Sequence, residues 1–425
     1  MLLLDDRLRL QLKESLALAC LFGLPLVAAA LENTPVVRVD AAGGQIFFKD
    51  SAGTSKTLVG SASGTGDWIF ADGLKLSDDD VLLPTFSGQY LRRDQVNQIG
   101  GGGTLVSETL DDDASLRWIH SMGSWLIKPN VNYKSELAVS LPQDSLGKGF
   151  FDMRQAGAGV ELERKGERLK SVRQNLGVSR TDYYHYQAAR SPLFGAEFLL
   201  DRRALDFVSY DYSIAADYVP WGDGLLSASA EGSYADYAHQ QTLEPNPVNP
   251  AGFVISSTNR HDWLGTWLLG LTQRWAGSLG GTPVEGSAGL TAGYVVLSSN
   301  QNDFDASQSG MGARFNSNYY SYHEISAGPL LSVTSGKWKS SLSYNYAQRS
   351  YVSRPVQDSS GAYLGGAVRT DTQTAAYSLT CQLGRGFSAQ ASGGYVHAAS
   401  NTRFENFYLY NYSYPYYFLG FGYSL

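Results

Sequence analysis

The sequence predicts an all-β protein whose antiparallel strands close into a membrane-spanning barrel. From Ser124 onward, apolar residues alternate with polar or small ones in successive segments, which is the period of a β-strand with two different faces. Short turns alternate with long polar connections along the same region, as in transmembrane β-barrels. After the N-terminal region, no apolar run reaches the about 18 residues that a membrane helix requires.

The composition also favours strands over helices. The 425 residues include 46 Gly and 27 Tyr but only 4 Met and 2 Cys. The mean hydropathy of -0.21 resembles that of a soluble protein, but lumen-facing and lipid-facing residues of a barrel alternate and cancel in such an average. The net charge of -7 and the lack of a polybasic patch argue against a nucleic-acid partner.

The stretch from Ser413 to Leu425 is the clearest strand. Its apolar face consists of Tyr417, Leu419, Phe421, Tyr423 and Leu425. The alternate positions are mostly small, so the apolar face is expected to contact lipid. The pattern resembles the C-terminal strand of bacterial outer-membrane β-barrels, although their last residue is usually Phe and here it is Leu. The resemblance implies an integral outer-membrane protein of a Gram-negative bacterium.

Residues 1–30 have the features of a secretory signal peptide. A basic start precedes an apolar segment that ends in three alanines, which predicts cleavage before Leu31. Whether Cys20, within the apolar segment, is a lipidation site stays open. Once this segment is removed, Cys381 is the only cysteine and no intramolecular disulfide is expected.

Residues 31–121 are predicted to form a small N-terminal extension, because their alternation is short and interrupted. The acidic runs Asp78–Asp80 and Asp111–Asp113 are interpreted as solvated turns, since a calcium loop needs ligands at fixed alternate positions. Gly100–Gly103 would serve as a hinge. The extension would then either enter the lumen as a plug or remain in the periplasm.

The barrel is expected to span residues 122–425 with about twelve strands. Five short turns and six long loops join these strands, and the order begins and ends on the turn side. Both termini are therefore predicted to be periplasmic. Thr104–Leu110 and Leu116–His120 could add one hairpin, which makes fourteen strands the alternative.

A set of charged residues falls on the predicted lumen face of these strands. Its members are Lys128, Lys134, Glu136, Glu161, Asp211, Asp217, Glu231, Arg274, Glu285, Glu324, Lys339 and Arg349. Acids outnumber bases, which favours a wet pore with a mild preference for cations. In a closed barrel, the same residues would neutralise one another in ion pairs.

Aromatic residues gather in the predicted outer loops. They are Tyr183, Tyr184, Tyr186, Tyr319, Tyr320, Tyr322, Tyr408, Tyr410 and Tyr412. A tyrosine ring suits both a membrane girdle and the stacking of a sugar or a partner. The girdle is the simpler interpretation.

No catalytic motif is visible, and no enzymatic activity is predicted. The histidines are His120, His185, His239, His261, His323 and His397, and none lies near a Ser, Asp or Cys in a nucleophile–base pattern. No metal site and no cofactor are predicted.

The leading hypothesis is a channel that passes a small polar solute or an exported polymer. One alternative is a non-conducting structural or adhesive barrel that binds a glycan or a partner through its loops. An outer-membrane hydrolase is the third. The expected partners are outer-membrane lipid and lipopolysaccharide, the barrel assembly machinery, and a polar solute or polysaccharide.

Overall fold

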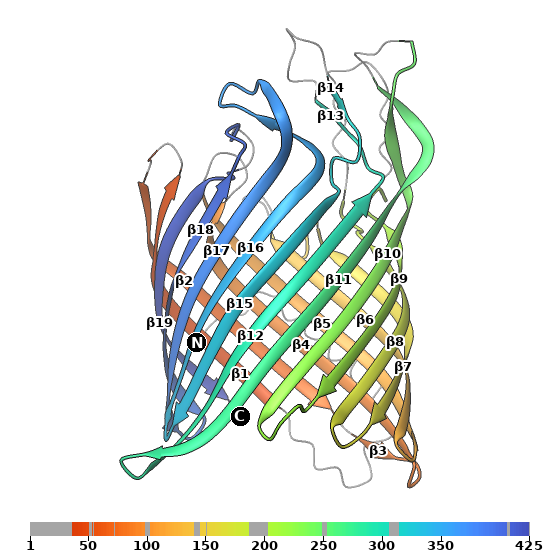
Figure 1. Cartoon of the computed structure of the whole chain (residues 1–425). Helices are drawn as coiled ribbons and strands as arrows, with labels where there is room; N and C mark the ends of the chain where they lie inside the picture. Colours follow the sequence, from red (N-terminus) through yellow and green to blue (C-terminus); the bar gives the residue numbers. More distant parts are fainter. Residues whose placement is uncertain are drawn as a thin grey trace.

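The computed structural model describes residues 36–50, 53, 55–71, 73–97, 103–139, 145–149, 151–186, 203–248, 253–305, 314–405 and 409–424. Within them, 16 long strands form one closed antiparallel barrel (Figure 1). The barrel strands are β1 (Val36–Asp50), β2 (Ser55–Ala71), β4 (Asp80–Asn97), β5 (Gly103–Met122), β6 (Trp125–Val139), β7 (Met153–Lys165), β8 (Leu169–Asp182), β9 (Phe207–Tyr218), β10 (Gly224–Pro245), β11 (Phe253–Leu279), β12 (Thr282–Ser299), β15 (Tyr322–Ser335), β16 (Trp338–Gln357), β17 (Tyr363–Gly384), β18 (Phe387–Ser400) and β19 (Tyr412–Ser424).

Three short strands complete the described secondary structure. β3 (Leu74–Lys75) pairs only with β4. β13 (Asp303–Asp305) and β14 (Arg314–Asn316) form a separate two-stranded sheet. Figure 1 shows this hairpin beyond one end of the barrel. No helix in the described part of the chain is long and apolar enough to cross a membrane.

Pairing between the first and last strands closes the barrel. β1 runs antiparallel to β19, with Val39 opposite Tyr423 and Ala41 opposite Phe421. Every barrel strand thereby has a partner on both sides. Closure is what a sheet in hydrocarbon requires, because lipid offers no hydrogen-bond partner to an open edge.

The pairing register separates an outer face from an inner one, since directly paired residues share a face. Leu419 and Phe421 are 62% and 70% exposed, although both are large and apolar. Leu290 and Leu342 lie on the same face of the sheet and are also exposed. Charged residues such as Lys128 occupy the opposite face, where they form ion pairs. The apolar face is therefore the lipid-facing outside.

The two ends of the barrel differ in their connections. Residues 123–124, 166–168, 280–281, 336–337 and 385–386 form tight turns at one end, called here the turn end. Gly280 and Gly281 have φ angles of 58° and 82°, as a two-residue hairpin turn requires. Longer connections, including the described residues 300–305 and 314–321, lie at the other end, called the loop end.

The predicted strand number is wrong in both forms, since 16 strands replace twelve or fourteen. The twelve predicted strands from Trp125 onward correspond to β6–β12 and β15–β19. The other four, β1, β2, β4 and β5, come from residues 36–122. The prediction that those residues form an N-terminal extension is wrong, because they form part of the barrel wall. Residues 1–35, including the predicted signal peptide and Cys20, lie outside the described residues.

Polar residues within strands explain this error. Asp111–Asp113 form no turn but lie in the middle of β5, paired with Gln89–Ser87. Three acids in a row hide the alternation, and the hairpin predicted from Thr104 to His120 is part of this one strand. The connection between β10 and β11 is likewise shorter than the long loop that was predicted there, because β10 continues to Pro245 and β11 begins at Phe253.

We predict that an introduced positive charge changes the stability of the barrel differently on the two faces of β16. Leu342→Arg would place a cation in lipid and should destabilise the barrel by about 2–4 kcal/mol if the site is near the bilayer midplane. Ser343→Arg, the adjacent inward position, should leave stability nearly unchanged. Urea unfolding in lipid vesicles measures both. A larger loss for Ser343→Arg than for Leu342→Arg would show that the register is displaced by one residue, because such a slip exchanges the two faces.

Candidate functional site

An ion-pair cluster lies on the inner wall near the turn end. The Lys128 ammonium is 2.7 Å from Glu161 Oε1 and 2.5 Å from Glu163 Oε2. Its side chain is only 12% exposed. One cation thus holds two carboxylates on β7 that would otherwise repel each other.

Further charges continue along the same wall. Lys134 contacts Glu136 at 3.1 Å and is paired in register with Asp113. The Arg173 guanidinium contacts Asp217 at 3.1 Å, and Ser171 and Ser227 donate hydrogen bonds to the same carboxylate. The bases of this wall are therefore already neutralised by neighbours.

Two acids on this wall lack such a partner. Asp211 accepts hydrogen bonds from Ser209 Oγ, and Glu231 is exposed to the lumen. Neither forms an ion pair among the described residues. They leave a net negative charge on the wall formed by β9 and β10.

All members of the predicted lumen set lie on the inward-facing side of the register. The five not yet described are Arg274, Glu285, Glu324, Lys339 and Arg349. Arg349 pairs with Glu324 at 2.7 Å toward the loop end. Glu285 and Lys339 both pair in register with Thr334, close to the turn end. Their role in conduction stays a prediction.

A row of aromatic side chains on β19 was missed. Tyr412, Tyr414, Tyr416 and Phe418, called here the aromatic ladder, point into the lumen, because they alternate with the lipid-facing Tyr417 and Leu419. Successive rings are in contact. Continuing the period of two upstream from Phe418 would have found them, but Tyr412 was assigned to an outer loop, and the alternate positions of the strand from Ser413 to Leu425 were described only as mostly small.

The predicted loop aromatics occupy several kinds of position. Tyr183, Tyr184 and Tyr186 follow β8, Tyr319 and Tyr320 precede β15, Tyr410 precedes β19, Tyr322 and Tyr412 are the first residues of β15 and β19, and Tyr408 lies outside the described residues. The loop prediction is wrong for Tyr322 and Tyr412, because strand pairing continues up to them.

At the loop end, arginines pack on these tyrosines. The Arg354 guanidinium lies 4.7 Å from the ring of Tyr319 and 5.4 Å from that of Tyr410. Arg260 lies 4.5 Å from the Tyr237 ring and contacts Asp262. Burial raises the pKa of the Tyr319 hydroxyl, so this ring stays neutral and keeps its hydrogen at ordinary pH. Cation–π contacts therefore organise the mouth of the barrel.

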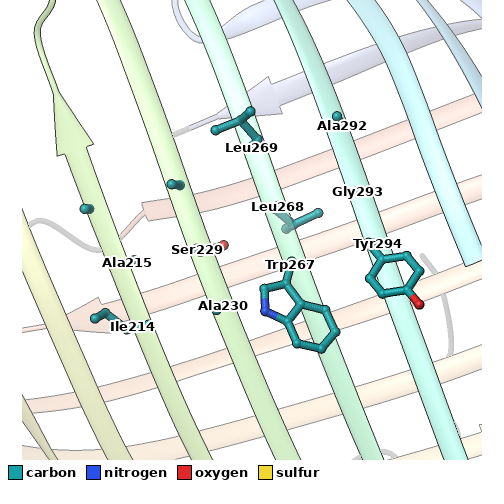
Figure 2. Close-up of a pocket in the computed structure, with 12 residues that line it drawn as sticks. Ile214, Ala215, Ser229, Ala230, Trp267, Leu268, Leu269, Ala292, Gly293 and Tyr294 are labelled. Carbon is teal, nitrogen blue, oxygen red and sulfur yellow. The ribbon is translucent and has the colours of Figure 1, made fainter.

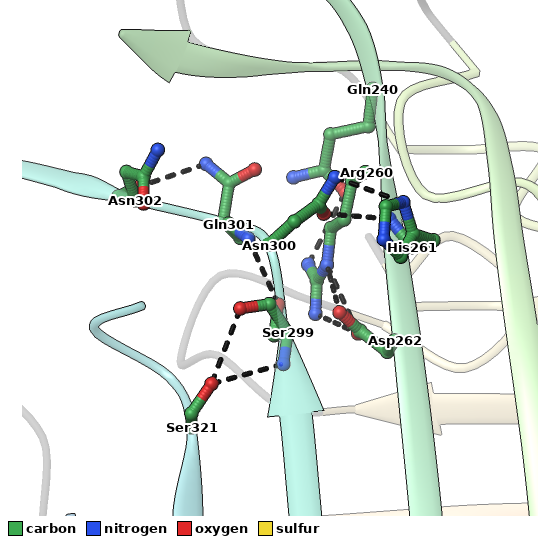
Figure 3. Close-up of polar contacts among 9 residues, drawn as sticks. All are labelled: Gln240, Arg260, His261, Asp262, Ser299, Asn300, Gln301, Asn302 and Ser321. Atoms are coloured by element: carbon green, nitrogen blue, oxygen red, sulfur yellow. Dashed lines mark hydrogen bonds and ion pairs between the residues drawn. The ribbon is translucent and has the colours of Figure 1, made fainter. Parts of the chain in front are cut away.

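Polar contacts fix the connection between β12 and β15 onto the strand ends (Figure 3). Asn300 Oδ1 accepts a hydrogen bond from the backbone N–H of His261, and Asn302 donates one to the carbonyl of Leu243. Ser321 Oγ accepts from the backbone N–H of Ser299. These bonds hold the base of the β13–β14 hairpin against β10–β12.

A groove of about 550 Å³ lies over β9–β12, but its position argues against a solute site. Figure 2 shows Trp267 and Tyr294 beside the small side chains of Ala230 and Ala292. These residues lie on the lipid-facing side of the register. The groove is therefore where acyl chains would pack.

Three of the histidines have polar partners that hold them in place. His120 contacts Asp80 at 2.8 Å, His185 contacts Asp152 at 3.1 Å, and His323 contacts the Tyr294 hydroxyl at 2.9 Å. Among the described residues, no group of three or more His, Cys, Asp or Glu side chains is placed to hold a metal ion.

We predict that Lys128 stabilises the barrel through its two carboxylates. Lys128→Met would leave Glu161 and Glu163 mostly covered and without their cation, at a cost of about 1–3 kcal/mol. Lys148→Met makes the same change on an exposed connection and should alter stability by less than about 0.5 kcal/mol. Urea unfolding compares the two variants. Similar small effects would mean that water in the lumen replaces the ion pair.

The closed barrel, apolar outside and charged or hydroxyl-rich inside, has the architecture of a transmembrane β-barrel. No protein-family model and no curated protein sequence matches the chain.

Several solved outer-membrane barrels are similar to it. OccK9 (OpdG) of Pseudomonas aeruginosa shares 11% identity at a TM-score of 0.44, over 92% of this chain and 98% of its own. OmpF of Salmonella typhi, in complex with daunomycin, shares 11% at 0.42, over 92% and 98%. OmpT of Vibrio cholerae shares 10% at 0.39, over 94% and 99%. The architecture of this chain follows from its own strand pairing.

Proposed function

We propose that this protein is a water-filled channel through which small polar solutes cross the outer membrane passively, without covalent chemistry. The strand number carries the proposal. About eight strands leave a lumen that side chains fill, whereas roughly 16 to 18 leave an aqueous channel. The barrel has 16. Many inward positions are small, including Gly157, Gly159 and Ser229, which supports an open lumen.

The charges of the lumen support a preference for cations. The bases Lys128, Lys134 and Arg173 are paired with acids, whereas Asp211 and Glu231 lack a cationic partner among the described residues. A net negative wall raises the local concentration of cations and lowers that of anions.

The proposed orientation follows the connections. The turn end would face the periplasm and the loop end the exterior, as in bacterial barrels with short periplasmic turns and long outer loops. The described chain begins with β1 and ends with β19 at the turn end. Lipid and lipopolysaccharide would surround the outer face, and the barrel assembly machinery would insert the chain.

Planar-bilayer recordings test the channel and its selectivity. The protein should produce stepwise ion currents, and the reversal potential in a KCl gradient should indicate cation preference. The double variant Asp211→Asn/Glu231→Gln should conduct with weaker cation preference, because it removes two lumen charges. Asp236→Asn removes a carboxylate from the outward-facing side of β10 and should leave selectivity unchanged.

Two results would contradict the proposal in different ways. Folded protein that yields no current in any preparation would favour the non-conducting adhesive barrel. Currents with equal selectivity in the wild type and the double variant would retain the channel but show that Asp211 and Glu231 do not set its preference.

A further inference from the structure

The aromatic ladder forms a continuous surface along the inside of β19. The ring centroids of Tyr412 and Tyr414 are 6.1 Å apart, those of Tyr414 and Tyr416 are 6.2 Å apart, and those of Tyr416 and Phe418 are 6.0 Å apart. Four rings at alternate positions of a strand cover about 20 Å along it. The surface is therefore longer than a single small solute.

Neighbouring strands leave room for these rings. Gly394 is paired with Tyr416, and a Cβ there would lie 2.7 Å from the Tyr416 hydroxyl oxygen. The Tyr416 ring thus lies over the glycine backbone of β18. On the other side, the ring of the buried Phe48 of β1 packs against that of Tyr412, with the ring centroids 5.9 Å apart. Tyr416 is thus supported by β18 and Tyr412 by β1, and all four rings of the ladder are partly exposed.

The wall beside the ladder carries hydroxyl and amide groups. Inward positions of β16 and β17 include Ser341, Ser343, Asn345, Thr372, Thr374 and Ser378. Ser341 and Ser378 are close enough for a hydrogen bond between their hydroxyls, at 2.6 Å. Between Lys339 and Arg349, no inward position of β16 is charged.

The charged wall lies on the other side of the barrel. β9, which carries Asp211 and Asp217, is halfway round the strand order from β19. β6 and β7, with Lys128 and Glu161, are also remote from β19 in that order. On the side of β16 and β17 the ladder therefore has uncharged polar neighbours, whereas on the side of β1 Asp50 is paired in register with Tyr412, at the loop end of the ladder.

From this juxtaposition we propose that the aromatic ladder is a binding track for neutral oligosaccharides built of hexopyranose rings. The C–H face of such a sugar is apolar and stacks on aromatic rings, while its hydroxyls project sideways and both donate and accept hydrogen bonds. The rings of β19 meet the first requirement, and the Ser, Thr and Asn side chains of β16 and β17 meet the second. This proposal rests on the channel function, since the track lies inside the lumen.

The track makes passage saturable. A sugar chain that leaves one ring can contact the next before losing all its contacts, so it would move along β19 without full release. Its residence in the lumen would then obstruct the flow of ions. Small ions themselves would pass beside the occupied or empty ladder along the charged wall.

Single-channel recording with maltohexaose as the probe tests this inference. The wild type should show concentration-dependent, saturable interruptions of its current. Tyr416→Ala/Phe418→Ala should weaken the apparent affinity by about tenfold or more, with ion conductance unchanged or raised. Tyr416→Leu/Phe418→Leu keeps apolar bulk for folding and should show a similar loss. Tyr417→Ala/Phe421→Ala removes two rings from the outer face of the same strand and should retain wild-type interruption.

Two further probes define the ligand class. Poly(ethylene glycol) of similar size has no pyranose face and should not give saturable interruptions. A hexamer of galacturonic acid has the same kind of ring with a carboxylate on each and should bind more weakly than maltohexaose, because the lumen is negative.

The outcomes separate this inference from the proposed function. Wild-type channels that conduct ions but respond to maltohexaose and the polymer alike would overturn the track and leave the channel intact. Equal interruption in the wild type and both ring variants would do the same. If no current is found, calorimetric titration of detergent-purified protein with maltohexaose decides: binding lost in the ring variants supports the ladder, and no binding overturns it.

Discussion

Backbone hydrogen bonding in lipid is the constraint on which the rest of this structure depends. A sheet edge exposed to hydrocarbon would leave a row of N–H and C=O groups without partners, at several kcal/mol each. The pairing of β1 with β19 removes that edge. Inward glycines keep the seam close: a Cβ at Gly422 would lie 2.2 Å from Asp40 Oδ1, and Gln390 donates a hydrogen bond to that oxygen. The N-terminal strands are therefore as necessary to the wall as the C-terminal one.

Closure also determines where charge is tolerated. Once the sheet is closed, alternate residues face either lipid or water, and Leu342 and Ser343 illustrate how adjacent positions meet different solvents. The inner face accommodates charged residues because many of them have an oppositely charged neighbour. Lys128, for example, contacts both Glu161 and Glu163. Acids left without such partners create the field of the lumen.

The sequence predicts the faces better than the number of strands. Glu161 and Asp211 could be assigned to one face because a strand has a strict period of two, so one clear apolar run orients every residue in it. β5 could not be recognised, because Asp111–Asp113 break the alternation of apolar and polar residues. Asp113 is tolerated within the strand because it is paired with Lys134 of β6, and the sequence alone does not show that pairing. The contacts at the loop end could not be predicted either, because the packing of Arg354 on Tyr319 depends on how a long connection folds back.

β19 takes part both in the closure of the barrel and in the lining of its lumen. Its odd positions, such as Tyr417, meet lipid, while its even positions, such as Tyr416, line the lumen. A slip of one residue would exchange the two faces, so the register of this strand must be fixed. The seam fixes it, because Tyr416 is paired with Ile46 on one side and with Gly394 on the other. The same pairing that protects the backbone from lipid therefore keeps the row of rings inside the channel, so that closure and the lining of the lumen depend on one set of contacts.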